Sequence, residues 1–324
     1  MKAIRVHRHG GPEVLACEDV ESRHPGPGEI LVRNRAIGVN FTDVYSRNGT
    51  FPPPSLPFTP GKEGAGEVLS TGEGVQGFAP GDRVAYVETL GAYAEETIVQ
   101  EHFLMHLPDA IDDATAAAST LRGLTAQFLL RRTFRVEKGQ TILMHAAAGG
   151  VGTILTQWAK HLGATVIGTV GSAAKAEIAR QNGCDHVINY HTEDFAARVA
   201  ELTGGERCDV VYDSVGKATF PGSLDCLRPF GTFVSFGLAS GPIPPFDIML
   251  LLEKGSLFAT WPGLTMYLAR RQDVLSMSLE LFDVIASGAV KLKPPLRLPM
   301  SEAAEAHRRI EDRGSTRLSV LVPA

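Results

Sequence analysis

The fold is decided by residues 141–152, which read TILMHAAAGGVG, because an apolar run ends there in a glycine-rich turn. Beyond the turn, apolar residues recur from Val151 to Leu162 at the spacing of one helix face. A second β-rich run follows at residues 164–169. Strand, glycine turn, helix and strand form the βαβ unit that holds a dinucleotide. In such a unit, Gly149, Gly150, Val151 and Gly152 bring the backbone close to a pyrophosphate at the helix N-terminus.

The turn departs at one position from the dinucleotide-binding pattern G-x-G-x-x-G, because Ala147 replaces the first glycine. A chance glycine-rich turn after a strand is the alternative interpretation. The turn follows a strand, opens a helix and begins a repeating β/α series, and this context favours dinucleotide binding.

The end of the second strand indicates which dinucleotide binds. Proteins that bind NAD usually place an Asp or Glu there for the ribose, whereas residues 167–172 read IGTVGS and contain no acid. A carboxylate would repel a 2′-phosphate, while the Ser172 hydroxyl and the Lys175 ammonium would hold one. The sequence therefore predicts NADP(H). The alternative is that Ser172 only caps the next helix and that Lys175 is solvated.

Composition and charge are those of an ordinary globular protein. Of 324 residues, 44% are hydrophobic and 21% charged, and the net charge is −5. This balance argues against nucleic acid as the principal partner, and no apolar run reaches the roughly 20 residues that span a membrane. The first residues alternate like a strand and lack the apolar core of a signal peptide, and the four cysteines are widely scattered. We therefore expect two domains and a cytoplasmic location.

Two kinds of pattern divide the chain. Residues 1 to 121 show short alternating runs between Gly and Pro clusters, which predicts a mostly β, small irregular barrel. From residue 122 onward, strands alternate with helical stretches, which predicts an α/β fold with a doubly wound parallel sheet. The expected strands of that sheet are residues 141–145, 165–169, 186–189, 209–212, 232–236 and 256–260. The expected helices are residues 124–130, 172–181, 261–292 and 301–312, and a last strand at 318–322 returns to the first domain.

Five stretches carry a family signature along nearly the whole chain: residues 10–15 (GGPEVL), 36–43 (AIGVNFTD), 145–152 (HAAAGGVG), 210–216 (VVYDSVG) and 234–237 (VSFG). Because the five stretches occur in this order and spacing, the chain resembles the zinc-independent NADPH:quinone oxidoreductases related to ζ-crystallin. These belong to the medium-chain dehydrogenase/reductase superfamily. The resemblance implies a GroES-like catalytic domain from residues 1–121 and 260–324, a Rossmann NADPH-binding domain from 122–259, and an active site in the cleft. It also implies a homodimer built by edge strands, expected here at residues 232–236.

Whether the protein binds zinc can be judged from the residue types at two positions. Zinc-dependent relatives have a thiolate where this chain has Asn40, and a Gly-His-Glu triplet where it has Gly61-Lys62-Glu63. An amide and an ammonium cannot replace a thiolate and an imidazole as zinc ligands. The four-cysteine structural lobe of those relatives is also missing from residues 90–95. We therefore expect no metal.

Without a Lewis acid, the acceptor must itself attract electrons. A quinone does so, and NADPH-dependent quinone reduction is the expected reaction. The protein must then hold nicotinamide and acceptor about 3–3.5 Å apart and stabilise the developing oxyanion with hydrogen-bond donors. Reduction of the C=C bond of α,β-unsaturated aldehydes or ketones is the alternative. The structural or RNA-binding role of some relatives is disfavoured by the acidic balance and the retained cofactor loop.

The resemblance assigns residues to this site. Asn40, Asp43 and Tyr45 are the catalytic candidates; a polar turn is the alternative for the first two, and an amphipathic wall residue for Tyr45. Surface roles are the alternatives for Thr125, Tyr190 and Arg313. His145 is interpreted as a hydrogen-bonded strand-end histidine rather than a base. Phe51 and Trp261 replace a phenol and a guanidinium of bacterial relatives, which makes the pocket more apolar. The cofactor-binding candidates are Asn40, Phe41, Thr42, Thr125, Gly149, Gly150, Val151, Gly152, Ser172, Lys175, Tyr190, Ser214, Phe236, Gly237, Leu238 and Arg313.

Overall fold

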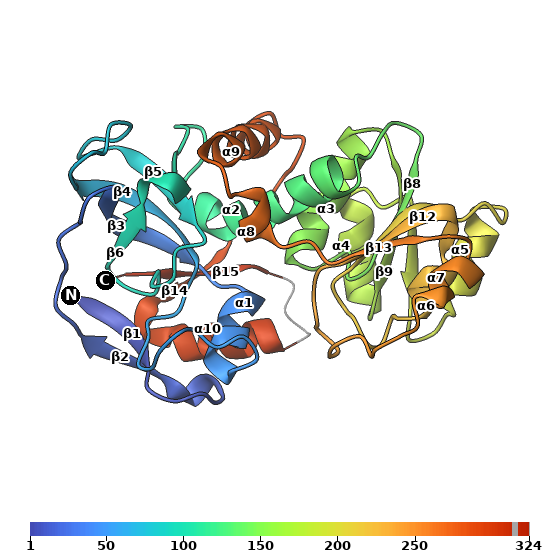
Figure 1. Ribbon diagram of the computed structural model, residues 1–324, viewed down its shortest axis with the longest axis horizontal. Helices are drawn as coiled ribbons and strands as arrows, with labels where there is room; N and C mark the ends of the chain where they lie inside the picture. Colours follow the sequence, from blue (N-terminus) through green and yellow to red (C-terminus); the bar gives the residue numbers. More distant parts are fainter. Residues whose placement is uncertain (313–316, 324) are drawn as a thin grey trace. The chain divides into compact units, whose positions relative to one another are not determined.

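A computed structural model describes residues 1–312 and 317–323 of the chain, which divide into two compact units (Figure 1). The first unit comprises Met1–Arg122, Leu268–Ala286 and Leu292–Ala324. The second comprises Gly123–Tyr267 and Ser287–Lys291. Within the described residues, no helix is both long and apolar enough to cross a membrane.

The first unit is built on a mixed sheet whose centre is the long strand β3. Strand β3 pairs antiparallel with β4, β6 and β15, and β14 lies parallel to β15 at one end. The path through the described strands has two ends, so the sheet is open rather than a closed barrel. Its strands are β14 (Leu296–Pro299), β15 (Ser319–Val322), β3 (Glu29–Gly38), β4 (Glu63–Thr71), β5 (Arg83–Val87), β7 (Leu104–His106) and β6 (Glu96–Gln100). A separate pair is formed by β1 (Lys2–Val6) and β2 (Leu15–Asp19).

Helices in the first unit were only partly predicted. The segment after β3 forms helix α1 (Phe41–Asn48), and α2 (Asp113–Phe128) begins well before the predicted residue 124. Helix α1 escapes detection because its buried face includes Asp43, Ser46 and Arg47, so it shows no apolar period. The other elements are α9 (Arg271–Ala286), α10 (Ala303–Glu311) and the short 3₁₀ turns Pro12–Val14, Glu101–Phe103 and Met300–Glu302.

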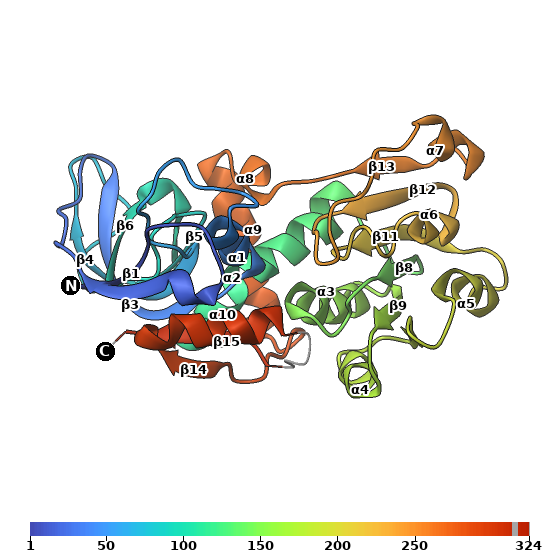
Figure 2. The ribbon, with the colours of Figure 1, turned by 90° about the horizontal axis from the view of Figure 1, so that it is seen from below.

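The second unit confirms the predicted doubly wound parallel sheet. Its strand order is β10 (His186–Asn189), β9 (Thr165–Val170), β8 (Thr141–Met144), β11 (Cys208–Asp213), β12 (Leu227–Ser235) and β13 (Phe258–Thr260). Helices α3 (Gly150–His161) and α4 (Ala173–Gln181) lie on one face, and α5 (Phe195–Leu202) and α6 (Gly222–Asp225) on the other (Figures 1 and 2). A π-helical turn (Leu129–Thr133), α7 (Met249–Glu253) and α8 (Leu264–Tyr267) complete the unit.

Two sequence predictions for this region were wrong. Residues 232–236 do not form an edge, because β12 pairs with both β11 and β13, and β13 is the edge strand. Strand order depends on contacts distant in sequence, which the local pattern does not contain. Residues 261–292 do not form one helix, because α8 begins only after Pro262-Gly263 and a break separates it from α9.

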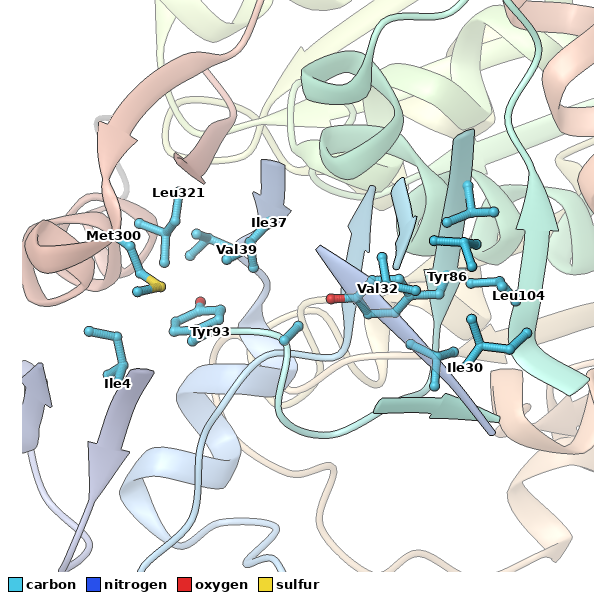
Figure 3. Packing of buried hydrophobic residues seen from close by; sticks show 14 of the residues in the cluster. Ile4, Ile30, Val32, Ile37, Val39, Tyr86, Tyr93, Leu104, Met300 and Leu321 are labelled. Atoms are coloured by element: carbon cyan, nitrogen blue, oxygen red, sulfur yellow. The ribbon is translucent and has the colours of Figure 1, made fainter. Parts of the chain in front are cut away.

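Each unit has its own apolar core. Figure 3 shows part of the core of the first unit, where the Tyr93 ring lies among Ile4, Val39 and Met300. The core of the second unit includes Leu143 and Ile167 from the central strands. Burying each such side chain contributes about 1.5–3 kcal/mol, so the two cores hold the strands in the register on which the sites depend.

Candidate active site

The glycine turn after β8 is closely packed against its own backbone. Gly149 precedes α3 in an extended conformation and has no side chain to cap the helix. A Cβ atom at Gly152 would overlap the carbonyl oxygen of Ala146 and lie 2.8 Å from the carbonyl carbon of Ala147. Ala146 itself has a φ of 54°, which makes the turn tight. The first N–H groups of α3 are therefore available to an anion such as a pyrophosphate.

Polar side chains follow the next two strands at the same edge of the sheet. Ser172 caps α4, and its hydroxyl accepts a hydrogen bond from the backbone N–H of Lys175 at 3.3 Å. Tyr190 follows β10, and a Cβ atom at Gly171 would lie 2.9 Å from its Cζ atom. The capping role considered for Ser172 is thus real. The capping bond leaves its hydroxyl hydrogen for a second partner.

The ends of β11 and β12 lie against each other. The Asp213 side chain accepts hydrogen bonds from the N–H groups of Val215 and Gly216 at 2.8 and 3.0 Å. Phe236 donates its N–H to the Asp213 carbonyl at 2.8 Å. A Cβ atom at Gly237 would lie 2.6 Å from the Ser214 carbonyl oxygen, so the two loops touch through backbone. Since parallel strands end at one edge, Ser214 and residues 236–238 share that edge with the glycine turn.

His145 is a fully hydrogen-bonded structural residue, as the sequence indicated. Its Nδ1 lies 2.8 Å from the Thr169 hydroxyl and its Nε2 lies 3.0 Å from the Ser223 hydroxyl. Ser223 donates in turn to Asp213 at 2.9 Å. Burial lowers the pKa of His145, which keeps the ring neutral. Although these residue types occur in hydrolases, Ser223 is fully buried and its hydrogen is held by Asp213, so it is no nucleophile.

In the first unit, Asn40 and Asp43 lie buried at the start of α1. The Asn40 side-chain amide donates to Glu63 Oε1 at 2.6 Å, and the Asn40 backbone N–H donates to Asp43 Oδ2 at 2.8 Å. Helix geometry thus replaces the polar turn that was the alternative interpretation. Thr42, in the same first turn, is half-buried, and its carbonyl accepts from the Ser46 hydroxyl.

Exposed aromatic side chains stand beside this buried polar pair. Phe41 is exposed, and its ring centroid lies 6.2 Å from that of Tyr45. Tyr45 makes an edge-to-face contact with exposed Phe51 at 5.5 Å. The three rings form an apolar surface, and Tyr45 adds a hydroxyl group to it. Such a surface suits a flat aromatic acceptor.

Glu63 was not recognised as a site residue from the sequence. It is fully buried, and its Oε2 accepts the backbone N–H of Leu121 at 2.6 Å. The Arg122 guanidinium lies 3.7 Å from Oε1. Burial raises the pKa of Glu63, while Arg122 and the donated hydrogen bonds oppose that rise. The sequence did contain a signal for Glu63. It is the last residue of the Gly61-Lys62-Glu63 triplet, which aligns with the Gly-His-Glu triplet of zinc-dependent relatives.

The remaining candidates lie in other parts of the chain. Thr125 lies half-buried on the part of α2 that belongs to the second unit, and Trp261 is exposed in that unit. Arg313 lies outside the described residues. Lys62 lies 3.9 Å from Glu88. Across residues 1–312 and 317–323, no three His, Cys, Asp or Glu side chains gather in a way that could hold a metal ion.

The fold and the glycine turn define a two-domain dehydrogenase or reductase of the dinucleotide-binding class. Family models match residues 26–109 as an alcohol dehydrogenase GroES-like domain and residues 150–276 as a zinc-binding dehydrogenase. A quinone oxidoreductase from Pseudomonas aeruginosa is 50% identical over 323 residues, which cover 99% of both chains. The chain belongs to the quinone oxidoreductase family of the medium-chain dehydrogenase/reductase superfamily.

Two further proteins extend the comparison. The crystal structure of an Escherichia coli quinone oxidoreductase complexed with NADPH superposes with a TM-score of 0.97 at 45% identity, with all of both chains covered. A 2-haloacrylate reductase from a Burkholderia species is 44% identical over 329 residues, covering 99% of this chain and 98% of its own.

Proposed function

We propose that the protein is an NADPH:quinone oxidoreductase that transfers a hydride to a quinone without zinc. The observation that carries the proposal is the end of β9: residues 167–172 contain no acid that would repel a 2′-phosphate, Ser172 caps α4 by accepting from the Lys175 backbone N–H, and Tyr190 lies against Gly171. The quinone oxidoreductases to which the chain is similar support the acceptor class. Oxidation of NADPH and NADH, each with a naphthoquinone, tests both parts.

Each part of the site has a distinct task in this proposal. When bound, NADPH supplies the hydride. The turn Gly149, Gly150, Val151, Gly152 binds the pyrophosphate, and the close approach at Gly152 supports this fit. Ser214, Phe236, Gly237 and Leu238 line the nicotinamide in the second unit, and Asn40, Phe41, Thr42 and Asp43 in the first. Tyr45 donates to the quinone oxygen. Thr125 and Arg313 remain proposed cofactor contacts.

Zinc independence is part of the same proposal. The two side chains at the ligand positions of zinc-dependent relatives are already engaged, because Asn40 donates to Glu63 and Lys62 faces Glu88. An amide that donates its hydrogens and a cationic ammonium both lack the deprotonated soft donor that a zinc ion requires. Hydride transfer must therefore depend on an electron-poor acceptor and on hydrogen-bond donors.

Replacing Lys175 by alanine is expected to raise the KM for NADPH about tenfold or more, with little change for NADH. A hydrogen bond to a charged group contributes about 1.5–3 kcal/mol, and only NADPH carries the 2′-phosphate. The measurement is the steady-state oxidation of each cofactor with one quinone. The matched control is Arg180→Ala. Arg180 is a cation on the same helix, and it forms an exposed ion pair with Glu177. Equal effects of Lys175→Ala on both cofactors would remove Lys175 from the phosphate site.

Reduction of activated C=C bonds is the second candidate function. The 44% identical 2-haloacrylate reductase favours it, since that name describes an electron-poor alkene as acceptor. Both reactions need the same hydride geometry. Turnover of a naphthoquinone compared with that of a 2-alkenal and a 2-haloacrylate, at equal NADPH, decides between them.

We further propose that the protein is a homodimer joined through β13. This strand is the edge of the second unit's sheet, and all three of its residues are exposed. Large apolar side chains are also exposed on the preceding elements: Phe230 on β12, Ile248 at the N-cap of α7 and Leu252 on α7. A bare edge strand with large apolar side chains is a template for a second copy of the same strand. Continuous pairing between two copies would bury both features.

Phe258→Asp is expected to convert the dimer to a monomer. Burial of a carboxylate in an apolar interface costs several kcal/mol. This cost exceeds the net free energy of association of a small interface. Sedimentation velocity measures the result. Leu279→Asp on α9 is the control, because Leu279 and Phe258 are both 62% exposed and Leu279 lies in the first unit. A dimer that survives Phe258→Asp would contradict the β13 interface.

The proposal also includes a cytoplasmic location and no nucleic-acid partner. All four cysteines are free thiols in the structure, three of them buried, as a reducing compartment allows. The net charge of −5 offers no electrostatic drive toward nucleic acid.

A further inference from the structure

A buried chain of hydrogen bonds links α10 to α1 within the first unit. Arg47 Nη1 lies 2.9 Å from His307 Nδ1, and His307 Nε2 lies 3.0 Å from the Tyr93 hydroxyl. Tyr93 donates to Asp43 Oδ2 at 3.1 Å. All four side chains are buried. The chain therefore ends on a residue assigned to the nicotinamide end of the site.

The direction of every bond in this chain follows from Arg47. A guanidinium only donates, so His307 Nδ1 must accept. Burial and the adjacent Arg47 charge lower the pKa of His307 to about 3, so the ring is neutral and carries its single proton on Nε2. His307 then donates to Tyr93, which leaves the phenol hydrogen for Asp43. Glu311 fixes Arg47 by two bonds of 2.8 and 3.0 Å.

The two oxygens of Asp43 are consequently unequal. Oδ2 receives the hydrogens of the Tyr93 hydroxyl and of the Asn40 backbone N–H. Oδ1 is buried and has no hydrogen-bond partner within the described residues. Only Oδ1 can therefore take a proton without breaking an existing bond.

The charges around Asp43 do not hold it in the ionised form. None of the ion pairs formed by the described residues includes Asp43. Burial and the nearby Glu63 carboxylate raise the pKa of Asp43 to about 7, against the two donors and Lys62. The charged or titratable groups that surround it are Lys62 and Glu63 at β4, Tyr93, Arg122 on α2, Arg47 on α1, and His307 and Glu311 on α10.

We propose that Arg47, His307 and Tyr93 are positioning residues that confine the proton of Asp43 to Oδ1, from which it is released to the reductase site. The chain is not a proton wire, because Arg47 does not release its proton. This inference rests on the proposed function, because the proton of Asp43 is used in the reduction of the quinone. Quinone reduction takes one hydride and one proton. Because Oδ1 is buried, Asp43 loses its proton through an intervening water molecule to the oxygen of the reduced quinone, and solvent reprotonates the carboxylate after product release.

The test measures Asp43 itself in the full-length protein without nucleotide. Infrared difference spectra against Asp43→Asn isolate the C=O stretch of the protonated carboxyl. That band is expected to disappear as pH rises, with a midpoint near 7. Tyr93→Phe removes one hydrogen bond to the carboxylate and is expected to raise the midpoint by about one to two pH units. Tyr86→Phe is the control, since that buried phenol of the same core donates to Asn34.

A conservative variant separates positioning from general damage to the fold. His307→Gln offers an acceptor to Arg47 and an N–H to Tyr93, so it should keep the wild-type midpoint, whereas His307→Leu should move it upward. The pH dependence of kcat should shift with the midpoint in each variant. A wild-type band that does not titrate between about pH 5 and 9, or a Tyr93→Phe midpoint equal to that of Tyr86→Phe, would overturn the inference. Normal titration without quinone turnover would count against the proposed function alone.

Discussion

Replacing Glu63 by glutamine is expected to lower the free energy of unfolding by about 3–5 kcal/mol, because it removes one member of a buried ion pair. Arg122 is buried and donates to the carbonyls of Ala118 and Val39, and Glu63 is the carboxylate that faces it at 3.7 Å. Without Glu63, a buried guanidinium would keep its charge and lose the carboxylate that faces it, leaving Asp43 as the nearby acid.

Glutamine cannot replace the carboxylate even though it has the same shape. Both oxygens of Glu63 accept hydrogen bonds, Oε1 from the Asn40 amide and Oε2 from the Leu121 N–H. Whichever way a glutamine amide is turned, its NH₂ group must face one of these donors. The same change would free the Asn40 side chain at the start of α1, so activity should fall together with stability.

Urea unfolding followed by circular dichroism measures the change. Glu67→Gln is the matched control, because Glu67 lies on the same strand and pairs with exposed Arg35, a kind of bond that contributes about 0–1 kcal/mol. If Glu63→Gln and Glu67→Gln lose similar amounts of stability, the buried pair does not support the first unit in the way described.

The second unit could be predicted from the sequence because its signals are local. The glycine turn and the apolar period of residues 151–162 identify β8, α3 and β9 within about 30 residues of chain. Strand bounds such as His186–Asn189 follow from short apolar runs between turns. The edge strand was missed because the position of a strand in a sheet depends on its partners rather than on its own residues.

The polar interior of the first unit left no such local signal. His307 meets Tyr93 across 214 residues of sequence and Arg47 across 260. A buried Arg, His or Glu looks like a surface residue in a sequence, because the partner that makes burial tolerable lies elsewhere in the chain. For the same reason, the segment that carries the catalytic candidates Asp43 and Tyr45 was not recognised as the helix α1.

Gly152→Ala is expected to raise the Kd for NADPH a hundredfold or more while the protein remains folded. The added methyl would overlap the Ala146 carbonyl oxygen, and the atoms in the way are backbone rather than a flexible side chain. Ala146 already has a positive φ, so the turn cannot simply tilt aside and must open. Two lost hydrogen bonds to a charged pyrophosphate, at about 1.5–3 kcal/mol each, correspond to at least two orders of magnitude in Kd.

The loss of binding has to be separated from a loss of folding. Overpacking costs about 1–3 kcal/mol, which lowers the melting temperature without unfolding the protein, and this is measured on the same samples. Gly263→Ala serves as the control, because a Cβ atom there would meet nothing within 4 Å. Fluorescence titration with NADPH and with NADH should show the same loss for Gly152→Ala, since both cofactors carry the pyrophosphate, whereas Lys175→Ala discriminates between them. An unchanged Kd in Gly152→Ala would place the pyrophosphate away from this turn, and the assignment of every residue along that edge of the sheet would have to change with it.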